Sequence, residues 1–261
     1  AMLAQVSYLN DDFVAAAEGY ARLVSMAPRN AGLHARYATV QMKLKDEAGA
    51  RASLTKALAL DPDLADAQVN LLNVYIGQKK FADALTLARS VQNRRPESAR
   101  GHKLEGDVLS AQNKQPEALK AYARAFDLQQ NGALLIQLHS ALIKNGKGAE
   151  AQSRMMEWFR QRPDDIPTRL YYASSMVVAK DYEAAAGHLH AVLKSDPDNV
   201  IALNDLAWTY QRMNRKDALP YAERAHKLAP NSPAIMDTLG WIYLETGNIG
   251  RAIPKLKKAS A

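Results

Sequence analysis

The sequence contains no cysteine, which excludes disulfide bonds, thiolate zinc sites and a cysteine nucleophile together. It also has only 13 glycines and 11 prolines in 261 residues, while alanine, leucine, lysine, glutamine and glutamate are abundant. Because glycine and proline disfavour helices most and the abundant residues favour them, the composition predicts an all-α fold. With 48% hydrophobic and 23% charged residues, the chain has a globular rather than a disordered composition.

Long hydrophobic runs are also missing. No apolar stretch reaches the roughly 18 residues that a membrane-spanning helix needs, so we predict no transmembrane segment. No basic, apolar signal peptide opens the chain either. Because Ala1 and Met2 fall in the middle of a repeat, we expect the natural N-terminus to lie upstream.

Charge of one sign is not concentrated anywhere in the chain. The formal net charge of +7 is compatible with nucleic acid or an anionic surface as partner, but the 34 basic residues are scattered among 27 acidic ones. This distribution favours an ordinary solvated helical surface, and we predict no nucleic-acid partner. RNA binding through basic residues and aromatics is a third alternative to the two functions developed below.

A repeat of 33 or 34 residues runs through the whole chain. Alanines mark it without exception, at Ala16, Ala50, Ala84, Ala118, Ala151, Ala185, Ala218 and Ala252. Prolines follow the same interval, with Gln130 in place of the fourth, at Pro28, Pro62, Pro96, Pro163, Pro197 and Pro230. Such a period predicts an α-solenoid, a right-handed superhelix of about eight stacked helix–turn–helix units.

We predict a single array over residues 1–261, with its first and last units truncated in a fragment of a longer protein. The predicted units are 1–28, 29–62, 63–96, 97–130, 131–163, 164–197, 198–230 and 231–261.

Small residues recur at two positions of the unit. When each proline is numbered position 32, the repeated alanine is position 20, in the second helix. Position 8, in the first helix, is alanine or glycine in six units, namely Ala4, Ala38, Gly106, Ala173, Ala207 and Gly240. The two exceptions are Leu72 and His139. Since positions 8 and 20 lie on facing sides of the two helices, they predict a close approach of the helix axes.

Polar residues in the turn after the proline predict helix caps. Ser232 is expected to cap a helix whose first residue is Pro233. Equivalent turns carry Asp63, Asp164, Asp165 and Asp198. Calcium binding is the alternative for these aspartates, but the twelve-residue loop with its glycine and terminal glutamate is lacking.

The combined pattern resembles the tetratricopeptide repeat. Small residues at positions 8, 20 and 27 and proline at 32 carry the resemblance, as does an aromatic residue at position 11, seen in Tyr75, Tyr210 and Tyr243. The resemblance covers essentially the whole chain. It implies a non-catalytic scaffold whose concave groove binds an extended peptide or a helix of another protein. It also implies that positions 2, 5, 9, 12 and 13 of the first helices line that groove.

Residues 202–259 carry a narrower resemblance through the stretches "LAWTY" and "DTLGW". They are similar to the C-terminal region of bacterial tetratricopeptide lipoproteins encoded with exopolysaccharide and PEP-CTERM sorting systems. This implies a periplasmic or outer-membrane-anchored protein with partners in exopolysaccharide assembly or export. If the resemblance to these lipoproteins does not hold, a cytoplasmic location is expected.

No arrangement of residues predicts catalysis. The stretch "GKG" at 146–148 lacks the loop and the following serine or threonine of a phosphate-binding P-loop, and it falls in a turn between helices. The six histidines are dispersed, and His188 and His190 stand two apart on a helix, so they point away from each other. We predict no enzyme, no cofactor and no metal site.

The first candidate site at the groove positions is polar. Asn73 is expected to face Arg100, Lys103 and Asp107 of the next unit, a set suited to a peptide carboxylate or backbone. It departs from the family's two-carboxylate clamp, which needs lysine at position 5 with asparagine at 9 in one unit and asparagine at 6 in the next. An ordinary solvated face is the alternative.

The second candidate site contains two of the three tryptophans. Trp208 and Trp241 both stand at position 9, flanked by Asn204, Arg212 and Asp237. Indoles about 10 Å apart would suit apolar side chains of a peptide or, as the alternative function, the sugar rings of a polysaccharide. Packing of both rings as extra core is the structural alternative. Apart from these two sites, the apolar ends of the array are a candidate surface for self-association of the chain.

Overall fold

The computed structural model describes residues 2–260, which form sixteen α-helices and no strand. The helices are α1 Met2–Leu9, α2 Phe13–Met26, α3 Ala31–Lys43, α4 Glu47–Leu60, α5 Ala65–Gly77, α6 Phe81–Arg94, α7 Ala99–Ala111, α8 Gln115–Leu128, α9 Gly132–Lys144, α10 Gly148–Gln161, α11 Ile166–Val178, α12 Tyr182–Ser195, α13 Val200–Arg212, α14 Ala218–Leu228, α15 Pro233–Glu245 and α16 Ile249–Ala259. The predicted all-α class is confirmed. None of these helices has both the length and the apolar character needed to cross a bilayer.

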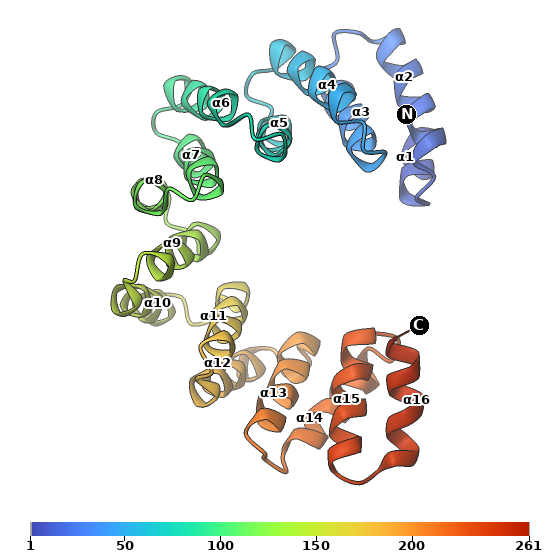
Figure 1. The fold of residues 1–261 in the computed structure, drawn as a ribbon, viewed down its shortest axis with the longest axis vertical. Helices are drawn as coiled ribbons and strands as arrows, with labels where there is room; N and C mark the ends of the chain where they lie inside the picture. Colours follow the sequence, from blue (N-terminus) through green and yellow to red (C-terminus); the bar gives the residue numbers. More distant parts are fainter. Residues whose placement is uncertain (1, 261) are drawn as a thin grey trace. The chain divides into compact units, whose positions relative to one another are not determined.

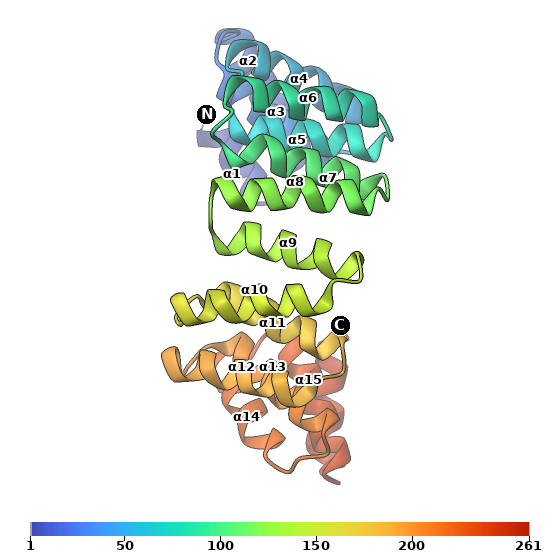
Figure 2. The same ribbon diagram turned by 90° about the vertical axis from the view of Figure 1, so that its left-hand side faces the viewer.

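The chain divides into two compact units, Ala1–Lys147 and Gly148–Ala261. The division falls in the turn before α10, inside the predicted repeat 131–163, so the single array over 1–261 stays a prediction. In the first unit, α3, α5 and α7 lie on the inner side of the stack, and α4, α6 and α8 lie on its outer side (Figure 1). Figure 2 shows α5 to α9 of the first unit lying across the stack, one beside the next.

The repeated alanines form the contact between the paired helices. All eight are buried, with exposed fractions of 0 to 4%. At position 8 the close approach is visible at two glycines. A Cβ on Gly106 would lie 2.7 Å from the ring of Tyr122, and one on Gly240 would lie 2.7 Å from Leu256. Small residues at position 8 therefore allow the paired helices to approach closely, as the sequence predicts, and at these two glycines the partner is the side chain at position 24.

The capping prediction is correct for one aspartate and wrong for the other residues. Asp165 accepts a hydrogen bond from the backbone N–H of Thr168 at 3.2 Å and caps α11. Ser232 stands at the N-cap of α15, ahead of Pro233, but its side chain makes no capping hydrogen bond.

The remaining three aspartates bind other side chains. Asp63 pairs with Arg95 at 2.7 Å, Asp198 pairs with Arg224 at 2.7 Å, and Asp164 accepts from the hydroxyl of Ser195 at 3.0 Å. The reason is register, because α5 and α13 begin one residue later than the prediction needs. Their N-cap residues are Leu64 and Asn199.

The turn between the two helices of a pair uses the left-handed region of backbone space. Gly146 has φ of 72° there; it and Lys147 lie in the predicted turn between α9 and α10, and Gly148, the last residue of "GKG", begins α10. The same conformation occurs at non-glycine residues in six other turns, at Asp11, Lys45, Lys79, Asn113, Lys180 and Asn214. An aspartate then caps the second helix in three pairs, namely Asp12, Asp46 and Asp181.

Candidate functional site

Helix α13 supplies the central side chains of the candidate site in the second unit. Asn199 caps it, accepting from the backbone N–H of Ala202 at 3.0 Å, and one of its faces is buried. The side chains of Asn204, Trp208 and Arg212 follow one another at intervals of four residues, so they share a face of the helix. Asp237 and Trp241 have the same spacing on α15, the neighbouring first helix, which α13 contacts directly.

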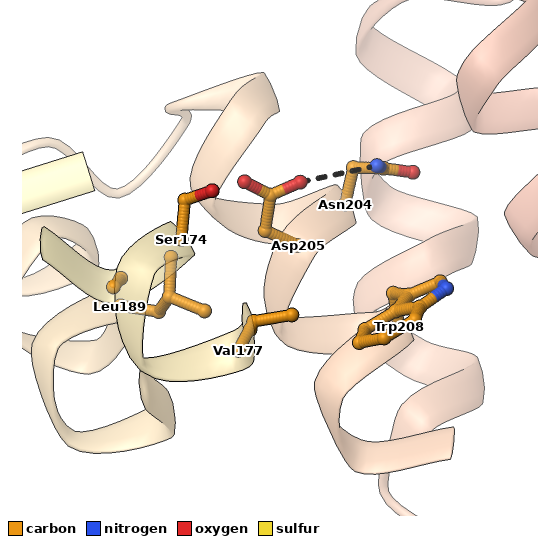
Figure 3. A pocket seen from close by; sticks show the side chains of 7 residues that line it. Ser174, Val177, Leu189, Asn204, Asp205 and Trp208 are labelled. Atoms are coloured by element: carbon orange, nitrogen blue, oxygen red, sulfur yellow. Dashed lines mark hydrogen bonds between the residues drawn. The ribbon is translucent and has the colours of Figure 1, made fainter. Parts of the chain in front are cut away.

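Trp208 stands between two pockets on this face. The first, the Asp205 pocket, has a volume of about 260 Å³. It is lined by Ala173, Ser174, Val177, Leu189, Asn204, Asp205 and Trp208 (Figure 3). The second, the Trp241 pocket, has a volume of about 350 Å³ and is lined by Trp208, Gln211, Arg212, Asp237, Thr238, Trp241 and Glu245. All five predicted residues of this cluster therefore line one pocket or both.

The two indoles differ in how firmly they are held. Trp208 is half-buried and packs edge-on against Tyr182, with 6.2 Å between ring centroids. The guanidinium of Arg212 lies 5.4 Å from the centroid of the Trp208 ring. Trp241 is 48% exposed and has no ring, cation or hydrogen-bond contact to other side chains in residues 2–260. Neither indole has the burial of a core residue.

Asp205 is the residue of this site that the sequence prediction missed. Its Oδ1 accepts a long hydrogen bond of 3.4 Å from Nδ2 of Asn204 (Figure 3). No basic side chain in residues 2–260 forms an ion pair with it, and burial raises the pKa of its carboxyl, against the opposing effect of the Asn204 hydrogen bond. Asp205 stands at position 6 of its unit, one of the positions that the family's carboxylate clamp uses to bind a ligand. This position was the feature of the sequence that could have identified Asp205 as a site residue.

The predicted polar cluster in the first unit is mostly engaged with itself. Lys103 pairs with Asp107 at 2.7 Å, four residues along α7. Tyr122 donates to the other carboxylate oxygen of Asp107 at 2.9 Å, and burial, followed by the charge of Asp107, raises the pKa of its hydroxyl. Asn73 is exposed and makes no hydrogen bond to Lys103 or Asp107 within the described residues.

Arg100, the fourth member, points to the turn before α5. Its Nη1 lies 3.5 Å from the backbone oxygen of Asp63 and 3.5 Å from Oε1 of Gln68. The structure therefore joins Lys103 to Asp107 but does not assemble the predicted set of four around one ligand position. As for metals, no group of three or more histidine, aspartate or glutamate side chains in residues 2–260 is placed to hold an ion.

Comparison with known protein families agrees with the helical pairs. Two family profiles described as tetratricopeptide repeat match the chain, one over residues 41–108 and one over residues 173–233. The chain contains tetratricopeptide repeats. Such repeats generally mediate protein–protein interaction and generally act as non-catalytic scaffolds. The second match covers every residue of the Asp205 pocket and ends before Asp237 and Trp241.

Two solved structures and one curated relative are similar to this chain. Yeast Tom70 aligns with a TM-score of 0.70 at 16% identity, over 95% of this chain and 55% of its own. A tetratricopeptide repeat protein from Parabacteroides merdae aligns with a TM-score of 0.55 at 16% identity, over 93% of both chains. A TPR repeat-containing protein of Pseudomonas aeruginosa is 31% identical over 159 residues, or 59% of this chain. The chain spans only 27% of that relative's length.

Proposed function

We propose that the second unit binds an extended peptide segment of a partner protein along α11, α13 and α15. The observation that carries this proposal is Trp208, whose indole forms a wall of both pockets. Alternate side chains of an extended peptide point to the same side, so two of them can enter neighbouring pockets while the backbone passes over the ring between them.

The exposure of Trp241 supports the proposal. Tryptophan is among the side chains that contribute most to binding when a partner covers them, because they bury a large area at little cost in conformational entropy. A peptide side chain seated against Trp241 would cover an indole that is 48% exposed in the free protein. The tetratricopeptide repeats, which generally bind proteins, support the same class of function.

The setting we propose is the bacterial envelope, with a partner from exopolysaccharide assembly or export. This part rests on the resemblance of residues 202–259 to the lipoproteins named above.

A capture experiment tests the proposal. The chain and its Trp208→Ala, Trp241→Ala double variant are used as baits in a bacterial envelope extract, after circular dichroism shows that both are folded. The matched control is Ile249→Ala, Ile253→Ala, which removes two exposed apolar side chains from α16 of the same unit. We expect a protein retained by the wild type and the control but lost by the tryptophan variant, and a peptide of that protein must then bind directly. Equal retention by all three baits would refute the proposal.

Polysaccharide binding is the second candidate, favoured by the polar lining of the Trp241 pocket. Two indole rings stand there with Asp237, Gln211 and Glu245, a combination of stacking surface and hydrogen-bond acceptors that suits a sugar. Titration with dextran and with alginate, followed by tryptophan fluorescence, separates this function from peptide binding. An unchanged spectrum with both glycans would rule it out.

A further inference from the structure

The Asp205 pocket combines apolar walls with a single ionisable group. Val177, Leu189 and the ring of Trp208 form its sides, and the carboxylate of Asp205 is its only charged group (Figure 3). At about 260 Å³ it is smaller than the roughly 300 to 1,000 Å³ of pockets that bind drug-sized molecules. The volume suits one side chain better than a whole ligand.

Two side-chain acceptors of the pocket, on Asn204 and Asp205, are short of hydrogen-bond donors. Oδ1 of Asn204 is buried and has no hydrogen-bond partner in residues 2–260. Turning the Asn204 amide over would not help, because its oxygen would then face the carboxylate of Asp205. Asp205 in turn has only the long bond from Asn204 and no ion-pair partner among the described residues. A buried acceptor left unpaired costs free energy, so a ligand that brings N–H donors into the pocket gains at Asp205.

Asp107 has an ion-pair partner within the chain, whereas Asp205 has none among the described residues. Asp107, at position 9 of its unit, is neutralised within the chain by Lys103 at 2.7 Å and accepts from Tyr122. In the second unit, Arg212 stands on the same helix as Asp205, but its guanidinium lines the Trp241 pocket and lies against the Trp208 ring. Asp205 is therefore left for a cation that comes from outside the chain.

We propose that the Asp205 pocket receives a lysine or arginine side chain of the bound peptide. The methylene stem packs against Val177, Leu189 and Trp208, and the cationic group donates to the carboxylate of Asp205. This inference rests on the proposed peptide-binding function and adds the chemistry of the partner. A free carboxylate or a phosphate is excluded from the pocket, because it would bring only negative charge to Asp205.

The test uses a display library of random heptapeptides selected on the whole chain. Three further baits are Asp205→Asn, Glu183→Gln as the removal of an exposed carboxylate on α12 outside both pockets, and the Trp208→Ala, Trp241→Ala variant as background. We expect the wild type and Glu183→Gln to enrich lysine or arginine at one fixed peptide position. Asp205→Asn should still select peptides but lose that enrichment, since asparagine has nearly the same shape and no charge.

A selected peptide then allows a double-mutant cycle. Replacing its basic residue by glutamine should weaken binding to the wild type by roughly tenfold or more, and should change binding to Asp205→Asn little. Peptides selected without a basic preference, or with one that survives Asp205→Asn, would overturn this inference and leave peptide binding standing. If the wild type selects no more peptides than the tryptophan variant, peptide binding itself fails and the inference fails with it.

Discussion

Nδ2 of Asn204 lies 3.4 Å from Oδ1 of Asp205, and this long contact is the only hydrogen bond that the Asp205 carboxylate accepts within residues 2–260. A half-buried carboxylate with one weak partner is not placed there by the needs of folding, because burial penalises its charged form. Residues that destabilise a fold while lining a pocket are typical of binding sites.

Replacing Asp205 by asparagine should therefore raise the thermal stability of the chain at neutral pH. Burial raises the pKa of Asp205 above its ordinary value of 3.8, so the folded chain holds this proton more tightly than the unfolded chain does. The resulting stabilisation is present below pH 3.8 and is lost as the pH rises through the folded-state pKa, where ionisation begins to cost.

Thermal unfolding from pH 3 to pH 8 measures this effect. The gain in melting temperature of Asp205→Asn over the wild type should be largest at neutral pH and should shrink as the pH falls through the raised pKa. Asp237→Asn, which removes an exposed carboxylate from α15, should show no such trend. A variant that is less stable than the wild type at pH 7 would contradict the argument.

Two glycines in helix interiors should respond in opposite ways to alanine. A methyl group added at Gly187 in α12 would have nothing within 4 Å of it, so Gly187→Ala should raise the free energy of unfolding by roughly 0.5 to 1 kcal/mol. Gly106→Ala places its methyl 2.7 Å from the ring of Tyr122, which is tied to Asp107 by a hydrogen bond. We expect it to lower the free energy of unfolding by roughly 1 to 3 kcal/mol. Urea denaturation measures both, and equal signs would contradict the close-packing account.

The repeated alanine allows a comparison within a single helix. Ala50 is fully buried in α4, while Ala48, two residues earlier, is exposed on the opposite face. Ala50→Leu should cost roughly 1 to 3 kcal/mol of stability through overpacking. Ala48→Leu should stay within about 0.5 kcal/mol of the wild type. If both variants unfold at the same urea concentration, position 20 does not set the helix spacing.

The fold could be predicted from the sequence because the same pattern of small residues recurs in eight units and predicts the same helix packing in each. Each alanine at position 20 must be buried inside the helix pair, whatever the surface residues are, and Ala16 to Ala252 are buried without exception. Helix caps were predicted less well, since a shift of one residue moves the cap from Asp198 to Asn199. Such a shift changes no buried contact, so the repeat pattern does not restrain it.

The candidate site could be predicted in part. The spacing of Asn204, Trp208 and Arg212 places them on one face, and helix geometry alone gives that result. Asp205 could not be recognised in the same way, because its role depends on whether a cation of another helix reaches it. In the first unit Lys103 reaches Asp107, and no periodicity distinguishes the paired carboxylate from the unpaired one.

The three tryptophans should separate into core and site when each is replaced by alanine. Trp158 is 5% exposed and donates to Asp165 at 2.7 Å, so Trp158→Ala should cost roughly 3 to 5 kcal/mol of stability. Trp208→Ala should cost roughly 1 to 3 kcal/mol, because the half-buried ring loses its contacts with Tyr182 and Arg212. Trp241→Ala should cost less than about 1 kcal/mol, since nearly half of the side chain already faces solvent.

Urea denaturation measures the loss of stability in each of the three variants. The loss of affinity for a selected peptide should follow the opposite order, so that the most exposed ring has the largest effect on binding. Trp241→Ala is expected to reduce the affinity for a selected peptide while leaving the unfolding transition almost unchanged, which only a residue used for binding can do. If Trp241→Ala lost as much stability as Trp158→Ala, Trp241 would be part of the core. The pocket between Trp208 and Trp241 would then no longer be supported as a binding site.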